Sequence, residues 1–578
     1  MTQEQPFDLL ILGAGLSGSM LAAIMARHGH RVLLLDAGTH PRFAIGEATT
    51  PDTSFRLKLL AAKYDVPEFA YLSQFYLLRD HVGPTSGIKR AFSFLYHRHS
   101  EDHVLHESHQ FPTGAPPWGP DCHLFRQDTD TFMLTTAARY GAIVQQKTRV
   151  TDIDIDPSGV VLRTEAGAVY RGAYLVDAAG YRSPVASQLQ LRGDPARMRT
   201  NSRAIFTHMI DVVPYDELGH SSRQLGLTYP LSQTTLHHVF PGGWFWVIPF
   251  GNHLDATNHL CSVGLLLDRT QYPETGQDPA SEFFAHVRRF PRLARQFSGA
   301  RAVRDWVSTG RLQYWSHRSV GDRYCLLAHA AGFVDPLYSS GLNLTVGVLD
   351  LLGAQLLQAF RSGDFSGASF AYIDQFFQDN LQLYDELVAN SYLSWQDYDL
   401  WDAWYRVWVA VLQVGTYMNG TQLMRYHRSH EHAVLEQSRH PPYTGLLGSK
   451  WERASAFYRR AAAHMDRYRE GRVSAAQAAR AIRALIEETS LCPSYWRLYD
   501  TDVRTTPPYT MSEMVRAYAW YWTHAPRDVR EHLVGFPPWT ASHYALRSLW
   551  TEHRRNWRRH NLGLRDAFRA WNDDWRHV

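Results

Sequence analysis

The pattern of apolar and polar positions divides the start of the chain into a strand, a helix and a second strand. Phe7–Leu12 is a short apolar run, and apolar residues continue at helical spacing as far as Ala26. Gly29 ends this pattern where glycine commonly follows a helix, and Val32–Leu35 is a second apolar run. The order predicts a β-α-β unit within a largely parallel sheet.

Glycines fill the first turn at the spacing of a dinucleotide-binding fold. Gly13 permits a tight turn, Gly15 lets the backbone approach a pyrophosphate, and Gly18 allows close packing of the helix. The helix N-terminus would then face the phosphates. Asp36 directly follows the second strand, where its carboxylate would accept a hydrogen bond from a ribose hydroxyl. A glycine-rich turn in an unrelated α/β domain is the alternative interpretation.

Two later segments favour FAD over NAD. Residues 176–180 resemble the strand and turn that return a flavoprotein chain to its FAD domain. Residues 324–327 form a short apolar run before Asp335, and a helix that begins at Gly341 would direct its positive end at the flavin. Residues 327–330 depart from the Gly-Asp-Ala of many flavoproteins, which leaves one ribityl or phosphate contact unassigned.

Beyond about residue 356 the pattern becomes helical and aromatic. Large aromatic residues recur at helical spacing between positions 395 and 408, which is more typical of a packed core than of a substrate pocket. We therefore predict an α/β fold: an FAD-binding Rossmann-type domain with an inserted antiparallel β-sheet substrate domain, and a helical C-terminal region. The predicted boundaries are 1–355 for the FAD-binding core with its inserted sheet (about 80–125 and 190–310), 356–446 for a helical lid and 447–578 for a helical extension.

Charge and cysteine content narrow the class of protein. The net charge is +3, which gives no reason to expect nucleic acid or an anionic membrane as partner. The four cysteines lie far apart without metal-ligand spacing, so we predict no metal site and a reducing, cytoplasmic location. The polar N-terminus lacks a signal-peptide pattern, and we expect no apolar run long enough to span a bilayer.

A tryptophan-rich strand introduces a resemblance to a known family. Trp244, Trp246, Ile248 and Pro249 match the W-x-W-x-I-P signature of flavin-dependent halogenases. The alternation places both indoles on one face of a strand, where they would keep a substrate ring away from the flavin and so suppress hydroxylation. An aromatic core strand is the alternative.

Residues 45–51 resemble the strap that these halogenases lay over the isoalloxazine ring, unless they form a plain loop between strand and helix. Gly46 would allow close approach of the backbone. The resemblance implies that several separate segments of the chain contact the cofactor. They are expected at Gly13, Ala14, Gly15, Ser17, Gly18, Asp36, Ala37, Arg42, Ile45, Gly46, Arg126, Gln127, Asp335, Gly341 and Leu342.

Lys89 is the candidate catalytic residue. The chain contains only five lysines among 59 basic residues, and Lys89 stands in a Gly-Ile-Lys-Arg segment that looks like the active-site lysine position of phenol-type halogenases. A lysine amine can be desolvated into a neutral or hydrogen-bonding form that receives hypohalous acid, whereas guanidinium stays protonated. A solvent-exposed lysine is the alternative.

Ser340 and Gly341 resemble the halide site of this family, and amides at a helix N-terminus are suited to bind an anion. Tryptophan-type halogenases carry a glutamate where this chain has Tyr338. The absence of this glutamate indicates an acceptor ring that is electron-rich enough to react without it, such as a phenol. Among the halogenases, the chain most resembles the phloroglucinol-type phenolic subgroup.

The predicted reaction is therefore chlorination or bromination of a small phenolic ring with reduced FAD, O2 and halide. Because a second dinucleotide fingerprint is lacking, a separate flavin reductase is expected to supply the reduced FAD. The alternatives are an aromatic monooxygenase that hydroxylates or epoxidises, halogenation of a carrier-bound acceptor, and a flavin-binding protein without chemistry.

Overall fold

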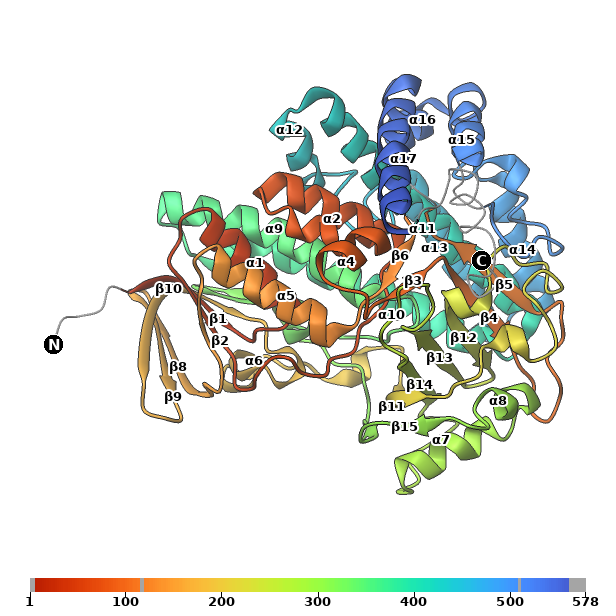
Figure 1. The fold of residues 1–578 in the computed structure, drawn as a ribbon, viewed down its shortest axis with the longest axis horizontal. Helices are drawn as coiled ribbons and strands as arrows, with labels where there is room; N and C mark the ends of the chain where they lie inside the picture. The colour runs from red at the N-terminus through yellow and green to blue at the C-terminus, as the bar shows by residue number, and fades with distance from the viewer. Residues whose placement is uncertain (1–5, 115–118, 508–510, 561–578) are drawn as a thin grey trace.

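The structure, a computed structural model, describes residues 6–114, 119–507 and 511–560. The predicted start is confirmed as β1 (Phe7–Leu12), α1 (Leu16–Arg27) and β2 (Val32–Leu35). β1 lies parallel between β2 and β10 (Val169–Asp177) at the centre of the first sheet. The strand order is β17-β18-β10-β1-β2-β7, and β9 pairs with β10 and with β8. Figure 1 shows β8 and β9 projecting from the sheet near β10. These outer strands are β17 (Val320–Gly321), β18 (Tyr324–Leu326), β7 (Ile143–Gln145), β8 (Val150–Asp156) and β9 (Gly159–Thr164).

A second sheet carries the tryptophan strand at its centre. Its order is β15-β11-β14-β13-β12-β4-β5, with β16 paired to β11. It comprises β4 (Ala91–Tyr96), β5 (Ser108–Pro112), β11 (Ser202–Ile210), β12 (Thr234–Phe240), β13 (Gly243–Pro249), β14 (Cys261–Asp268), β15 (Arg301–Ala302) and β16 (Val307–Ser308). All pairings except that of β4 with β12 are antiparallel. The prediction of an inserted, largely antiparallel sheet is confirmed.

Alternation along β13 gives the two faces of this sheet different neighbours. Trp244 and Trp246 belong to the large core shared with the FAD-binding sheet. Phe245 and Val247 belong instead to a smaller core that includes residues of α7 (Pro279–Val287) and α8 (Pro291–Gln296). Both indoles therefore belong to the same core as the first sheet, and not to the core beside α7 and α8.

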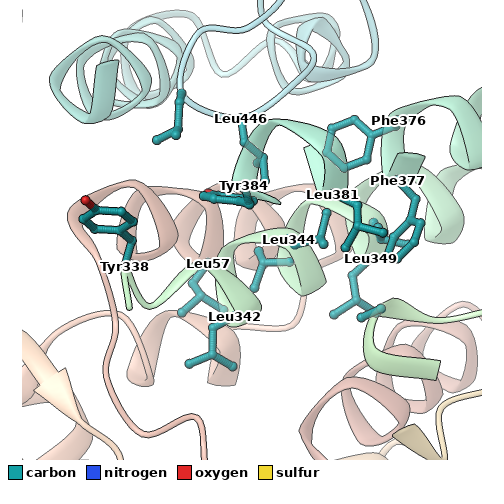
Figure 2. Close-up of a cluster of buried hydrophobic side chains, with 14 of the residues drawn as sticks. Leu57, Tyr338, Leu342, Leu344, Leu349, Phe376, Phe377, Leu381, Tyr384 and Leu446 are labelled. Atoms are coloured by element: carbon teal, nitrogen blue, oxygen red, sulfur yellow. The ribbon is translucent and has the colours of Figure 1, made fainter. Parts of the chain in front are cut away.

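Long helices join the FAD-binding domain to the C-terminal region. α9 (Ser340–Ser362) packs against α1 and against α10 (Gly367–Ser394), and α11 (Tyr398–Ser429) packs against α10. Figure 2 shows Leu344 and Leu349 of α9 near Leu381 and Phe377 of α10, and Leu342 near Leu57. One continuous apolar core contains residues from both regions. The boundary predicted at residue 355 falls inside α9, so the helical region continues directly from the FAD-binding core.

Residues 561–578 of the predicted extension lie outside the described part. The remaining helices surround the apolar core. They are α2 (Pro51–Tyr64), α3 (Glu68–Tyr71), α4 (Phe75–His81), α5 (Arg126–Arg139), α6 (Pro184–Gln188), α12 (His432–Leu435), α13 (Glu452–Arg469), α14 (Ala475–Glu488), α15 (Met511–Thr523), α16 (Arg527–Leu533) and α17 (Pro538–His560). A short two-stranded sheet consists of β3 (Gly87–Lys89) and β6 (Asp121–His123).

The expectation that no apolar run could span a bilayer is wrong for α9. By length and composition this helix would suffice, but 83% of its apolar window is buried inside the protein. The apolar residues of α9 pack against α1, α2 and α10, which accounts for their hydrophobicity.

Candidate active site

A cleft runs along the carboxyl ends of the parallel strands, where ligands bind in open α/β sheets. Its volume is about 520 Å³, which lies in the ordinary range for ligand sites. The glycine turn, the end of β2 and the N-terminal turns of α1, α5 and α9 contribute to its wall. Of the predicted cofactor residues, those that line the cleft are Gly13, Gly15, Ser17, Asp36, Ala37, Arg42, Arg126 and Leu342.

The glycine turn fits a dinucleotide. Gly13 has a φ of +96°, and a Cβ on Gly18 would lie 2.0 Å from the carbonyl oxygen of Gly13. Both positions therefore require glycine for the fold itself. A Cβ on Gly15 would meet nothing within 4 Å, because this residue borders the open cleft at the N-terminus of α1. That free space beside exposed helix amides suits a pyrophosphate.

Asp36 is bound more fully than the sequence indicated. Its carboxylate accepts from the N–H groups of Ala14 (2.6 Å) and Gly38 (2.7 Å), and from both terminal nitrogens of Arg42 at 2.5 and 2.7 Å. Burial opposes its charge, but the Arg42 and backbone hydrogen bonds outweigh this and lower the pKa of Asp36. These donors occupy about four lone-pair positions, so a ribose hydroxyl would have to displace one of them.

The start of the strap, residues 45–51, is held by Arg126. Arg126 donates to the carbonyl oxygens of Ile45 (2.6 Å) and Gly46 (3.1 Å), while its other nitrogens bind Asp130. Gly46 has a φ of +89°, which favours glycine. Arg126 therefore connects the cofactor cleft to the strap, in keeping with its predicted place near the flavin.

The predicted halide residues stand at the first turn of α9. Ser339 precedes the helix in the left-handed conformation, with a φ of +52°. A Cβ on Gly341 would lie 2.8 Å from Nε2 of His329, a buried nitrogen without a hydrogen-bond partner. Burial lowers the pKa of His329 to about 4, so the ring is neutral near pH 7. Halide binding by Ser340 and Gly341 remains a prediction.

The two signature tryptophans are almost fully buried, and their ring centroids lie 5.9 Å apart. Nε1 of Trp246 donates to Oγ of Ser262 at 3.1 Å, which fixes the indole on the sheet face. Ile248 lies on the same face. This rigid surface is consistent with the predicted shield between flavin and acceptor.

Several predicted cofactor residues lie outside the cleft lining. The N–H of Ala14 binds Asp36 and Gly18 supports the turn, so both act from behind the cleft wall. The carboxylate of Asp335 is buried and accepts from Ser202, Tyr392 and the N–H of Leu337. Burial raises the pKa of Asp335 to about 7 against these hydrogen bonds. Among the described residues, the predicted contacts that do not line the cleft are Ala14, Gly18, Ile45, Gly46, Gln127, Asp335 and Gly341.

Lys89 is not the exposed lysine of the alternative interpretation, because its side chain is completely buried. Its Nζ donates to the carbonyl oxygen of Thr49 in the strap at 2.6 Å and lies 3.3 Å from the ring centroid of Phe92. Burial lowers the pKa of Lys89 to about 7, although the charge of Asp121 acts in the opposite direction. A lysine poised in this way can exchange a proton near neutral pH.

Sequence reasoning missed Asp121, the residue that stands opposite Lys89 in the β3–β6 pair. It is also completely buried, and its Oδ1 accepts from Oγ of Ser54 at 2.8 Å. Its Oδ2 is buried without a hydrogen-bond partner. Burial raises the pKa of Asp121 to about 6, against the effects of Lys89 and Ser54. The position of Asp121 in a short buried strand was the one signal in the sequence that could have marked it. The sequence does not show that this strand pairs with the distant strand that carries Lys89.

A mostly apolar pocket adjoins the segments that surround Lys89. Pro51 and Phe55 contribute from α2, directly after the strap and after Ser54. Gly114 contributes next to Thr113, whose hydroxyl donates to the carbonyl oxygen of Lys89. The opposite wall comes from α11 and α15, and it consists of Thr416, Tyr417, Gly420, Met514 and Tyr518. The C-terminal extension thus helps to form a pocket near the candidate catalytic residue.

Known proteins resemble the chain over most of its length. The profile of a NAD(P)-binding Rossmann-like domain matches residues 11–76, and the tryptophan halogenase profile matches residues 66–407. The monodechloroaminopyrrolnitrin halogenase PrnC of Pseudomonas fluorescens is 38% identical over 92% of this chain and 96% of its own. The tetracycline 7-halogenase of Kitasatospora aureofaciens is 39% identical over 92% and 95%, respectively.

Solved structures agree in fold and family. The crystal structure of halogenase PltM in complex with phloroglucinol and FAD superimposes with a TM-score of 0.82 at 32% identity. The match covers 86% of this chain and 99% of PltM. The predicted fold class and the resemblance at the level of the family are confirmed. The chain therefore belongs to the tryptophan halogenase family of flavin-dependent halogenases.

Proposed function

We propose that this flavin-dependent halogenase places chlorine or bromine on a small, free phenolic ring, with Lys89 as its catalytic residue. The observation that carries the proposal is the complete burial of Lys89 against the strap. FADH2, O2 and halide are the reagents of the family, and together they supply hypohalous acid. A separate flavin reductase delivers the reduced cofactor. Four buried free cysteines support a reducing, cytoplasmic location.

In the proposed mechanism Lys89 receives the hypohalous acid and holds it beside the acceptor. The amine binds the acid by a hydrogen bond, which positions the halogen toward a ring carbon. The halogen then passes to that carbon, the ring loses a proton, and the oxygen leaves as water. Trp244 and Trp246 keep the acceptor apart from the flavin, and the buried surroundings exclude bulk water.

The tyrosine at position 338 supports a phenolic acceptor. Its hydroxyl forms a hydrogen bond with Oγ of Ser391 at 2.7 Å, and its ring stacks on Trp408 with centroids 4.6 Å apart. A neutral, fixed side chain at this turn supplies no carboxylate to stabilise a ring cation. An ionisable ring hydroxyl can supply that electron density from the acceptor itself.

Product analysis with a matched set of acceptors tests the proposed substrate class. Phloroglucinol, resorcinol, tryptophan and pyrrole-2-carboxylate would each be incubated with FAD, a flavin reductase, NADH and bromide. We expect brominated product from the two phenols at least tenfold faster than from the other two acceptors. Faster bromination of tryptophan or of the pyrrole would contradict the phenolic class.

We further propose that the acceptor enters beside Pro51 and Gly420, where the apolar pocket has a volume of about 20 Å³ and must widen to hold a ring. A Cβ on Gly420 would lie 3.5 Å from the ring of Phe55, in ordinary van der Waals contact, so a leucine side chain there would extend into the pocket. We expect Gly420→Leu to raise the KM for the preferred phenol about tenfold, a loss of about 1.4 kcal/mol of binding. Oxidation of reduced FAD should be unchanged. An unaltered KM in a stably folded variant would exclude this pocket as the acceptor route.

A further inference from the structure

Lys89 and Asp121 form a buried pair of opposite charges that the rest of the site does not explain. They face each other across the β3–β6 ladder, and neither side chain is exposed to solvent beyond 1%. A buried carboxylate oxygen without a partner is costly unless another group compensates its charge. Oδ2 of Asp121 is such an atom. The nearby ammonium of Lys89 is the natural compensating group.

Of the groups that surround the pair, Asp121 is the one whose charge can stabilise the ammonium of Lys89. The charge of Lys89 acts on His123 and His237, but burial is the main cause that lowers the pKa of each to about 3, so both are neutral near pH 7. Burial also raises the pKa of the Cys122 thiol, which therefore stays protonated. Lys58 favours the charged form of Asp121, and it also acts to lower the pKa of Cys122.

We propose that Asp121 is a positioning residue whose buried carboxylate sets the protonation state of Lys89 during halogenation. Its negative charge favours the ammonium form of Lys89, against the burial that favours the neutral amine. This inference rests on the proposed catalytic function of Lys89.

Thr49 and Ser54 position the two members of the pair. The Thr49 carbonyl oxygen accepts one proton of Lys89, and this strap residue is itself bound to Cys122 on β6. Ser54 occupies Oδ1 of Asp121 and leaves Oδ2 available. The strap and α2 thus hold both members of the pair, and the charge of Oδ2 remains without a hydrogen-bond donor.

Titration of Lys89 in Asp121→Asn tests the inference without turnover. Uniform labelling of lysine at ¹³Cε yields signals from five residues, and loss of one signal in Lys89→Met assigns Lys89. Removal of the carboxylate removes the charge that favours the ammonium, so the pKa of Lys89 should fall by about one unit. An unchanged pKa in the folded variant would overturn the proposal.

The pH dependence of halogenation provides the second readout. Whichever form of Lys89 is active, the limb of the profile that reports its titration should move to lower pH in Asp121→Asn. Ser54→Ala should move the limb in the same direction by a smaller amount, because it weakens the charged form of Asp121. Cys122→Ala, a neutral change on the same strand, should leave it in place.

The two proposals fail in different ways. A shifted Lys89 pKa with full activity of Lys89→Met would support the pairing and reject the catalytic lysine. An inactive Lys89→Met with an unshifted pKa in Asp121→Asn would retain the catalytic lysine and reject the function assigned to Asp121.

Discussion

Replacement of Lys89 by methionine should abolish halogenation while oxidation of reduced FAD continues. Methionine keeps an unbranched, buried side chain of similar length but supplies no amine, so packing against Phe92 is largely retained. Loss of a positioned proton-transfer group typically lowers a rate by about 10²–10⁴-fold, and we expect halogenated product to fall by this factor. Reduced FAD, O2 and halide should still produce hypohalous acid, detectable with a halogen-accepting dye in solution.

Lys89→Arg serves as the matched variant. It keeps a positive charge, but the guanidinium stays protonated and its planar fork does not fit the buried site of a single ammonium. We expect Lys89→Arg to be as inactive as Lys89→Met. If either variant retained more than a tenth of the wild-type product rate, Lys89 would not be the catalytic residue.

Gly15→Val should abolish tight FAD binding without unfolding the protein. Gly15 has an extended backbone, with φ −68° and ψ −178°, which a β-branched residue adopts readily. Because the added side chain points into the cleft, it would occupy the space assigned to the pyrophosphate. We expect the Kd for FAD to rise at least 100-fold, about 2.7 kcal/mol, with an unchanged melting temperature of the FAD-free protein.

Gly18→Ala provides the contrast. Its Cβ would overlap the carbonyl oxygen of Gly13, so the turn itself must shift. Overpacking of this kind costs about 1–3 kcal/mol, and the FAD-free melting temperature should fall. Flavin fluorescence titration and thermal melts of both variants distinguish the two effects. Tight FAD binding by Gly15→Val would place the pyrophosphate elsewhere.

The local parts of the fold could be predicted because their signals are contiguous in the sequence. The glycine turn, its flanking strands and Asp36 lie within thirty residues of one another, and each follows from backbone geometry. Trp244 and Trp246 were placed on one face by the two-residue period of a strand. Only the tertiary structure shows which face of the sheet this is, namely the face whose core includes residues of the FAD-binding domain.

Contacts between distant segments could not be predicted in the same way. Asp121 joins Lys89 only through the β3–β6 ladder, and a single aspartate in the sequence resembles any surface acid. Arg42 was expected to contact the cofactor, but its hydrogen bonds to Asp36 depend on how the loop after β2 folds back. The apolar residues of α9 likewise predicted a helix, but the elements that cover it, α1, α2 and α10, follow only from the tertiary fold.

Bromination under ¹⁸O₂ tests the central claim most directly, because it distinguishes halogenation from oxygenation in one experiment. Phloroglucinol would be incubated with the protein, FAD, a flavin reductase, NADH, bromide and ¹⁸O₂. The masses of the products would then be measured by mass spectrometry. A halogenase transfers the halogen and releases the oxygen as water, so we predict a product with the paired bromine isotopes and no ¹⁸O. A product that contained ¹⁸O and formed equally well without bromide would contradict the account and identify a monooxygenase.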